Sequence, residues 1–143
     1  MATVTVSRHI DRPPAAVWAL LSDLERHTDW MGDAEWVVFL GPPRRGVGTV
    51  MVARTRYGPI RMDDLMEVVG WVEGHSITVR HDGLVTGTGE LRVDPEGAGS
   101  RATWTEDLTF PWRLGGPVTA WLAVPVLRRV FRRSLDRLAG LLA

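Results

Sequence analysis

Residues 117–143 read PVTAWLAVPVLRRVFRRSLDRLAGLLA, and their hydrophobic periodicity predicts one long helix. From Val124 onward the apolar side chains fall on one face of a helix with about 3.6 residues per turn, and the arginines fall on the other face. Burying each Leu, Val or Phe of the apolar face stabilises a fold by roughly 1.5–3 kcal/mol. The helix therefore needs a large apolar partner, and we expect the strands before it to form a sheet curved around it.

The same helix changes character at Pro125. Val118, Trp121 and Leu122 lie on the side that the arginines occupy one turn later, so the first turns are apolar nearly all round. Proline cannot donate a hydrogen bond to the carbonyl of Trp121, so we expect a kink or a break. One interpretation is a static bend that follows the sheet. The others are a gate between the glycines at 115–116 and Pro125, with Trp121 and Leu122 near its entrance, or a homodimer contact.

Composition excludes several classes of function. The 143 residues fit one domain, residues 1–143, and a formal net charge of zero gives no global field that would attract nucleic acid or an anionic membrane. The sequence contains no cysteine, which excludes disulfides, thiolate nucleophiles and cysteine-ligated metals. All 17 basic residues are arginine, which excludes lysine Schiff bases.

Targeting and cofactor motifs are also missing from the sequence. The first residues lack the apolar core of a signal peptide, and the longest apolar run, 120–127, is too short to span a bilayer. No dinucleotide-binding fingerprint, Walker loop, nucleophile elbow or zinc-binding helix is present, and His27, His75 and His81 are too scattered to indicate a metal site. We therefore expect a cytoplasmic protein with no cofactor, no metal, no nucleic-acid partner and no integral membrane segment.

The chain before the long helix is organised as strands, with two short helices after the first strand. Asp11 is a plausible cap for the first helix, residues 25–31 form the second, and His9 is expected to be a solvated strand residue. Turn signals separate seven strand candidates, 3–10, 36–40, 48–57, 60–71, 76–81, 85–93 and 101–110. This order predicts an α+β domain with a highly curved antiparallel sheet.

Four short motifs occur in a specific order along the chain. They are PPAAVWALLSD at 13–23 followed by Trp30, GVGT at 46–49, WVEG at 71–74 and GSRATWTE at 99–106 before the long helix. In this order they resemble the START-like or SRPBCC superfamily of helix-grip folds, in particular its polyketide cyclase/dehydrase and lipid-transport branch. The resemblance implies an apolar cavity between the sheet and the terminal helix, although the fold is shared more widely than any reaction.

Strand parity places three ionisable residues on apolar faces. Glu106 follows the parity of Trp104 and Leu108, and His81 and Asp64 also fall among apolar neighbours. One interpretation is that His81 and Glu106 form a proton-transfer pair, with Asp64 as a second polar anchor. The alternative is that all three lie at strand ends, in reach of water at the cavity mouth.

These observations predict the binding of one hydrophobic small molecule, such as a lipid or polyketide-like compound. One alternative is a cyclase, aromatase or dehydratase that uses His81 and Glu106 as acid and base, and another is a protein-interaction module of the same superfamily. The predicted ligand contacts come from strand parity, from the helix and from the family resemblance. They are Trp30, Met51, Thr55, Tyr57, Met62, Asp64, Met66, Val79, Trp104, Leu108, Trp121 and Leu122.

Overall fold

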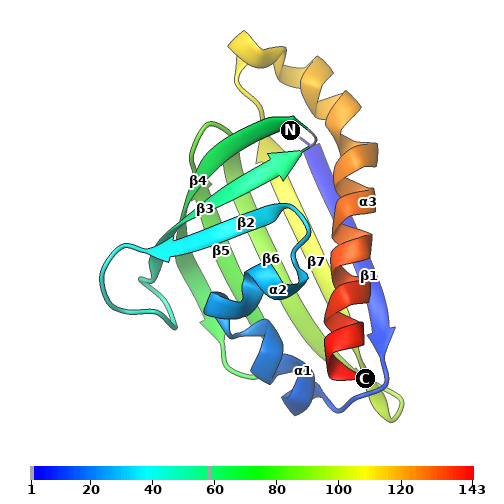
Figure 1. The fold of residues 1–143 in the computed structure, drawn as a ribbon. Helices are drawn as coiled ribbons and strands as arrows, with labels where there is room; N and C mark the ends of the chain where they lie inside the picture. Colours follow the sequence, from blue (N-terminus) through cyan, green and yellow to red (C-terminus); the bar gives the residue numbers. More distant parts are fainter. Residues whose placement is uncertain (1, 58) are drawn as a thin grey trace.

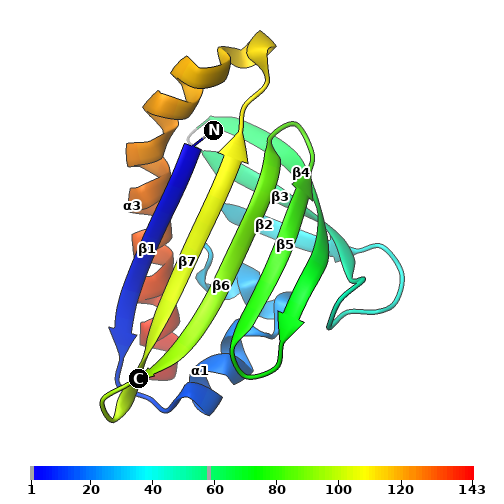
Figure 2. The same ribbon diagram turned by 180° about the vertical axis from the view of Figure 1, so that it is seen from behind.

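A curved sheet and one long helix make up most of the computed structural model (Figures 1 and 2). The structure describes residues 2–57 and 59–143, and for Tyr57 and Ile60 it describes the backbone but not the side chain. The strands are β1 (Ala2–Ile10), β2 (Ala34–Phe39), β3 (Val50–Tyr57), β4 (Ile60–Val72), β5 (Ser76–Asp82), β6 (Thr86–Glu96) and β7 (Gly99–Thr109). The helices are α1 (Pro14–Leu21), α2 (His27–Trp30) and α3 (Gly116–Leu142), with single 3-10 turns at Leu24–Arg26 and Trp112–Leu114.

The seven strands form one antiparallel sheet in the order β1-β7-β6-β5-β4-β3-β2. The first strand thus pairs with the last, from Ala2 opposite Leu108 to Ile10 opposite Ser100. Figure 1 shows the sheet curling so that β2 and β3 cross in front of β6 and β7, with α3 along β1. The predicted α+β helix-grip architecture, a curved sheet around the terminal helix, is confirmed.

The apolar face of α3 packs on the concave side of the sheet. Leu127, Phe131, Leu135 and Leu138 are buried, whereas the arginines at 132 and 133 are exposed. Phe131 stacks on Trp104 of β7 with ring centroids 4.1 Å apart. This contact joins the helix to the sheet at the centre of the core, as the periodicity of α3 predicts.

Pro125 bends α3 without ending it. The helix runs from Gly116 to Leu142 with the proline inside it, and Figures 1 and 2 show a bend in its N-terminal half. A missing amide donor and the crowding of the proline ring explain such a bend. In the described part of the chain no helix is both long enough and apolar enough to cross a membrane.

Local details around the first two helices differ from the sequence-based expectations. The residue before α1 is Pro13, and no side chain caps the helix, so Asp11 is not its cap. Instead Asp11 lies 2.9 Å from Nε2 of His9, whose Nδ1 lies 2.7 Å from Glu96. His9 is therefore partly exposed to solvent, as expected, but it is also tied to two carboxylates. The segment expected as one helix is divided into a 3-10 turn and the short α2.

Glu73, in the turn after β4, connects α1 to β4 through hydrogen bonds. Its carboxylate accepts hydrogen bonds from the indole N–H groups of Trp18 at 3.1 Å and Trp71 at 2.7 Å. Arg45, from the loop between β2 and β3, donates to the same carboxylate at 2.7 Å and lies over the Trp71 ring. This cluster closes the end of the molecule opposite the start of α3.

Candidate functional site

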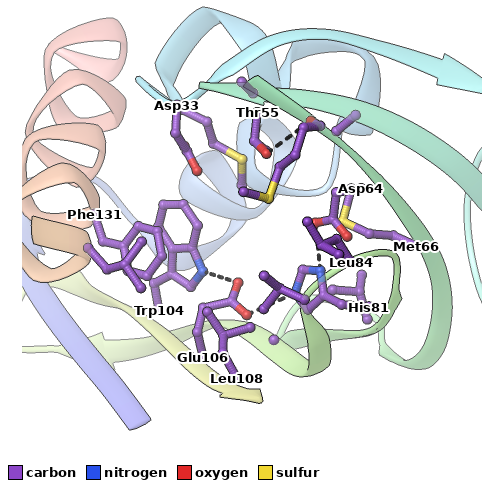
Figure 3. Close-up of a pocket in the computed structure, with 18 of the residues that line it drawn as sticks. Asp33, Thr55, Asp64, Met66, His81, Leu84, Trp104, Glu106, Leu108 and Phe131 are labelled. Atoms are coloured by element: carbon purple, nitrogen blue, oxygen red, sulfur yellow. Dashed lines mark hydrogen bonds and ion pairs between the residues drawn. The ribbon is translucent and has the colours of Figure 1, made fainter. Parts of the chain in front are cut away.

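A cavity of about 760 Å³ lies between the sheet and α3. Its walls come from β2 to β7, from the segment around α2 and from α3 as far as Phe131, and most of the lining atoms are apolar. The curvature of the sheet makes this space, because α3 packs closely only against β1 and β7 and leaves the side of β3, β4 and β5 unfilled. Figure 3 shows the polar end of the cavity, where Asp64, His81 and Glu106 meet.

Most of the sequence-predicted site residues line this cavity. The structure places eleven of them in its wall: Met51, Thr55, Met62, Asp64, Met66, Val79, His81, Trp104, Glu106, Leu108 and Leu122. The side chain of Tyr57 lies outside the part of the chain that the structure describes. Alternation was enough to find the inward residues of β4, β5 and β7, because the buried face of the sheet is also the cavity face, whereas the inward face of β3 came from the family resemblance.

Two predicted ligand contacts do not line the cavity, and both are tryptophans. Trp30 is completely buried, with its ring edge-on to Trp104 at 5.8 Å, so it supports the cavity wall from behind. Trp121 is 76% exposed on the outer face of α3. The sequence could not separate these roles, because a tryptophan supplies the same apolar surface to a core, a cavity or an exterior patch.

The polar end of the cavity is a chain of three ionisable side chains. Nδ1 of His81 lies 2.8 Å from Oδ2 of Asp64, and Nε2 of the same ring lies 2.9 Å from Oε2 of Glu106. The indole N–H of Trp104 donates to Oε1 of Glu106 at 2.9 Å. His81 and Glu106 are 8% and 6% exposed, so they are not at a solvated mouth, as one of the sequence-based alternatives held.

Both carboxylates favour the protonated form of His81. Burial alone would lower the pKa of this imidazole, but hydrogen bonds to Asp64 and Glu106 and the negative charges of both groups outweigh burial and raise its pKa to about 10. At neutral pH the ring is therefore an imidazolium that donates from both nitrogens. It can give up a proton or hold a hydrogen-bond acceptor in place, but it cannot act as a base.

Glycines in β6 allow this chain to form. His81 belongs to β5 and Glu106 to β7, and Gly89 of the intervening β6 lies opposite Glu106. A Cβ atom on Gly89 would lie 2.6 Å from each carboxylate oxygen of Glu106. Gly87 faces His81 in the register and has a φ of 139°, a conformation that suits only glycine.

Sequence reasoning did not single out these glycines, although a signal was present. The stretch TGTG at 86–89 places two glycines two residues apart inside a strand. Glycine in a strand interior often marks a close approach of another group. Here the approaching groups are the side chain of Glu106 at Gly89 and the backbone of Asp107 at Gly87.

Other charged groups border the cavity, but they have partners beside it. Arg61 and Asp63 of β4 are exposed residues that also border the cavity. Arg61 pairs with Glu35 at 3.0 Å, and Asp63 accepts from Arg54 at 2.5 Å. Exposure alternates along this part of β4, where Met62 and Asp64 are less exposed than Arg61 and Asp63, so alternation predicts side-chain direction here as well.

His27 also lines the cavity and differs from His81. Its Nε2 lies 2.8 Å from the backbone oxygen of Leu21, and no carboxylate contacts the ring. Burial lowers the pKa of His27, so this ring stays neutral. Within residues 2–57 and 59–143, no group of three or more His, Asp and Glu side chains has the arrangement of a metal site.

Comparison with protein families gives one match over the whole length. The model of the family described as "Polyketide cyclase / dehydrase and lipid transport" matches residues 1–143. No curated protein is similar enough in sequence to count as a match.

Solved structures with the same fold are distant in sequence. The crystal structure of the Thermus thermophilus protein TTHA0849 is 21% identical with a TM-score of 0.80, over 98% of this chain and 96% of that one. A solution structure from Thermobifida fusca is 21% identical with a TM-score of 0.79, over 99% and 93%. Major latex-like protein 151 from Panax ginseng is 14% identical with a TM-score of 0.74, over 97% and 95%. At these identities the similarity shows the fold alone.

Proposed function

Because the chain belongs to the polyketide cyclase/dehydrase and lipid-transport family, we propose that it binds one hydrophobic small molecule in the cavity between the sheet and α3. The family description names activities on hydrophobic molecules, which suggests a ligand of that kind. The single observation that carries the proposal is the cavity itself, since about 760 Å³ falls within the roughly 300–1,000 Å³ of small-molecule sites.

The lining supports a ligand that is apolar over most of its length. Met51, Met66, Val79 and Leu108 contribute side chains to the wall, and methionine adapts its shape to irregular apolar surfaces. Three ionisable side chains, Asp64, His81 and Glu106, meet at one end of the cavity, and Asp33 and Thr55 lie on the other side (Figure 3). A molecule with a long apolar body and one polar end matches this distribution.

Tryptophan fluorescence tests the proposal directly. Trp104 lines the cavity and stacks on Phe131, so a bound ligand should change its emission. The protein is titrated with long-chain alcohols and amines, fatty acids, quinones, sterols and aromatic polyketides, and we expect a saturable response with one site for at least one class. Native mass spectrometry of the purified protein identifies any ligand that it retains. No saturable response to any class, with no retained ligand, would contradict the proposal.

The hydrogen-bonded side chains of Asp64, His81 and Glu106 favour a second function, an enzymatic one. In an enzyme of the cyclase or dehydratase type, the imidazolium of His81 would act as the acid and a carboxylate oxygen of Glu106 would accept a proton from an enolisable substrate. We rank this function below binding because both carboxylate oxygens of Glu106, the proposed base, already accept hydrogen bonds, from His81 and from Trp104. If it is right, a bound ketone should exchange its α-hydrogens in D₂O, and Glu106→Gln should abolish the exchange.

A further inference from the structure

The number of protons held by Asp64, His81 and Glu106 follows from their geometry. Each of the two hydrogen bonds, at 2.8 and 2.9 Å, joins a ring nitrogen to a carboxylate oxygen and needs one proton. If both carboxyl groups and both ring nitrogens were deprotonated, the two carboxylates and the imidazolate would carry three negative charges in total. The two protons of the hydrogen bonds reduce this total to one negative charge. The net charge is therefore minus one wherever the protons sit along the chain.

The other described groups of the cavity wall do not neutralise this charge. Arg61 shares Glu35 with Arg56, which does not line the cavity, Asp63 pairs with Arg54, and Glu90 lies 3.2 Å from Arg92. Two further titratable groups line the cavity, the neutral His27 and the carboxyl residue Asp33, and neither brings a positive charge. A net negative charge thus remains in a largely apolar enclosure, where a charge without a counter-charge is costly.

One carboxylate oxygen of the chain is open toward the cavity. Asp64 uses Oδ2 for His81, and Oδ1 makes no hydrogen bond within the described part of the chain. The Asp64 side chain is 18% exposed and lines the cavity, so a group inside can approach it. Oδ1 accepts hydrogen bonds only, unless a third proton is added to the chain.

From the uncompensated charge and the open acceptor we propose that the polar end of the ligand is a protonated amine, which donates a hydrogen bond to Oδ1 of Asp64. The ammonium supplies both the missing positive charge and the missing donor. A carboxylate or phosphate at the same place would face a negative charge and a surface of acceptors. This inference rests on the proposed function and narrows it: the cavity takes hydrophobic amines and rejects fatty acids and anionic lipids.

Three probes of equal chain length test the inference. Decylamine, decanol and decanoate are titrated below their micelle concentrations at pH 7 and followed by tryptophan fluorescence. We expect decylamine to bind about tenfold or more tightly than decanoate, with decanol between them, since a unit charge a few ångströms away gives at least this discrimination. The wild-type ratio decides the question even if a variant fails to fold.

Two variants then test whether the preference for an amine over a carboxylate arises at Asp64. In Asp64→Asn the amine-to-carboxylate ratio should fall by about tenfold, because the site becomes neutral. Asp107→Asn is the matched control, since Asp107 belongs to β7 next to Glu106 but faces the other side, where Thr3 donates to it at 2.6 Å. Its ratio should equal the wild-type ratio.

The outcomes separate this inference from the proposed function. If all three probes bind with similar affinity, or decanoate binds best, the charge preference is wrong and hydrophobic binding stands. If none of the probes and no other class in the wider titration binds, both are wrong. An equal loss of the ratio in Asp64→Asn and Asp107→Asn would show that amines bind outside the cavity, and would also overturn the inference.

Discussion

His81 and Glu106 lie 2.9 Å apart although their strands, β5 and β7, are not neighbours in the sheet. Adjacent strands are about 4.8 Å apart, so about 10 Å separates the two backbones. The side chains meet over β6, at Gly89. Any side chain at this position would occupy the space that the carboxylate now fills, so the chain of polar groups depends on a residue that contributes no side chain.

Gly89→Ala should therefore break the hydrogen bond between His81 and Glu106. The new Cβ would lie 2.6 Å from both oxygens of Glu106, and the carboxylate, as the flexible partner, must move away from His81 and Trp104. Losing buried hydrogen bonds to a charged group should lower the free energy of unfolding by about 1–3 kcal/mol. The pKa of His81 should return toward its ordinary value. Urea denaturation and NMR titration of the ring measure the two effects.

Gly140→Ala is the matched control for this substitution. Gly140 lies in α3 and is exposed, and a methyl group added to it would have no other group within 4 Å. Alanine there should leave the His81 titration unchanged and raise the stability by about 0.5–1 kcal/mol, because glycine disfavours a helix interior. If His81 kept its raised pKa in Gly89→Ala, the role assigned to the glycine would be wrong.

The stability of the protein should depend on pH through His81. Its folded pKa of about 10 lies above the ordinary value of 6.5. The protonated ring thus stabilises the fold fully below pH 6.5, and this contribution disappears as the pH rises through about 10. The difference in unfolding free energy between the wild type and His81→Asn should shrink over that window, as followed by urea denaturation at a series of pH values.

His27 provides a comparison of opposite sign. Burial lowers its pKa, so its neutral form is the one that the fold accommodates. Its contribution is present above the ordinary value of 6.5 and is lost as the pH falls below it. The advantage of the wild type over His27→Gln should therefore shrink toward acid. Parallel slopes for the two histidines would contradict the assignment of one charged and one neutral ring.

The fold was predictable because its signals are local. The alternation of apolar and polar residues in the strands, and the apolar face of α3, each indicate which side of the element is buried. Buried faces can pack together in only a few architectures. The prediction that Asp11 caps α1 was wrong because its carboxylate pairs with His9 instead. The pairing of His9 with Glu96 in turn requires the register of distant strands. Short helices such as α2 are decided by tertiary packing more than by sequence pattern.

The site was predictable by face but not by contact. Parity placed Asp64, His81 and Glu106 on the inner face, but their order, with the ring in the middle, depends on the sheet order and on the curvature. The separation of Trp30 from Trp104 had no local signal either, since both are inward tryptophans and only their depth differs. The TGTG stretch was readable in principle, but its meaning needs the residues that approach it.

Filling the cavity should abolish binding while leaving the polar end intact. Ala123 lies on α3, is half-buried and lines the cavity. Ala123→Phe places a ring in the space proposed for the ligand, so the affinity for a decyl probe should fall by about tenfold or more. Stability should change little, because the ring enters an open volume and displaces no packed side chain.

The control for Ala123→Phe adds the same ring to the surface. Ala19 is exposed on α1, away from the cavity wall, so Ala19→Phe should bind the probe as the wild type does. Both variants are compared by fluorescence titration and by urea denaturation. Undiminished affinity in a folded Ala123→Phe would place the ligand elsewhere.

Pro125 bears on how a ligand enters. Leu114, Thr119, Leu122 and Val126 line the cavity from the segment that leads up to the proline and just past it. Leu122 and Val126 are also 59% and 54% exposed, so this segment forms the wall at the place where the cavity opens outward. The segment begins at glycines with positive φ and contains a proline that removes one helix hydrogen bond. These features favour a part of α3 that can move.

Pro125→Ala separates a moving segment from a static bend. Restoring the amide donor to the carbonyl of Trp121 should straighten the helix and raise the unfolding free energy by about 1–2 kcal/mol, reduced by the greater freedom of alanine in the unfolded chain. If the bend opens the way into the cavity, the association rate of a decyl probe in stopped-flow fluorescence should fall severalfold, and the dissociation rate should fall with it, because a gate slows both directions and leaves the affinity nearly unchanged. A static bend predicts the same gain in stability with an unchanged association rate. That result in a folded Pro125→Ala protein would exclude the gate and leave the proline as an adaptation of α3 to the curvature of the sheet.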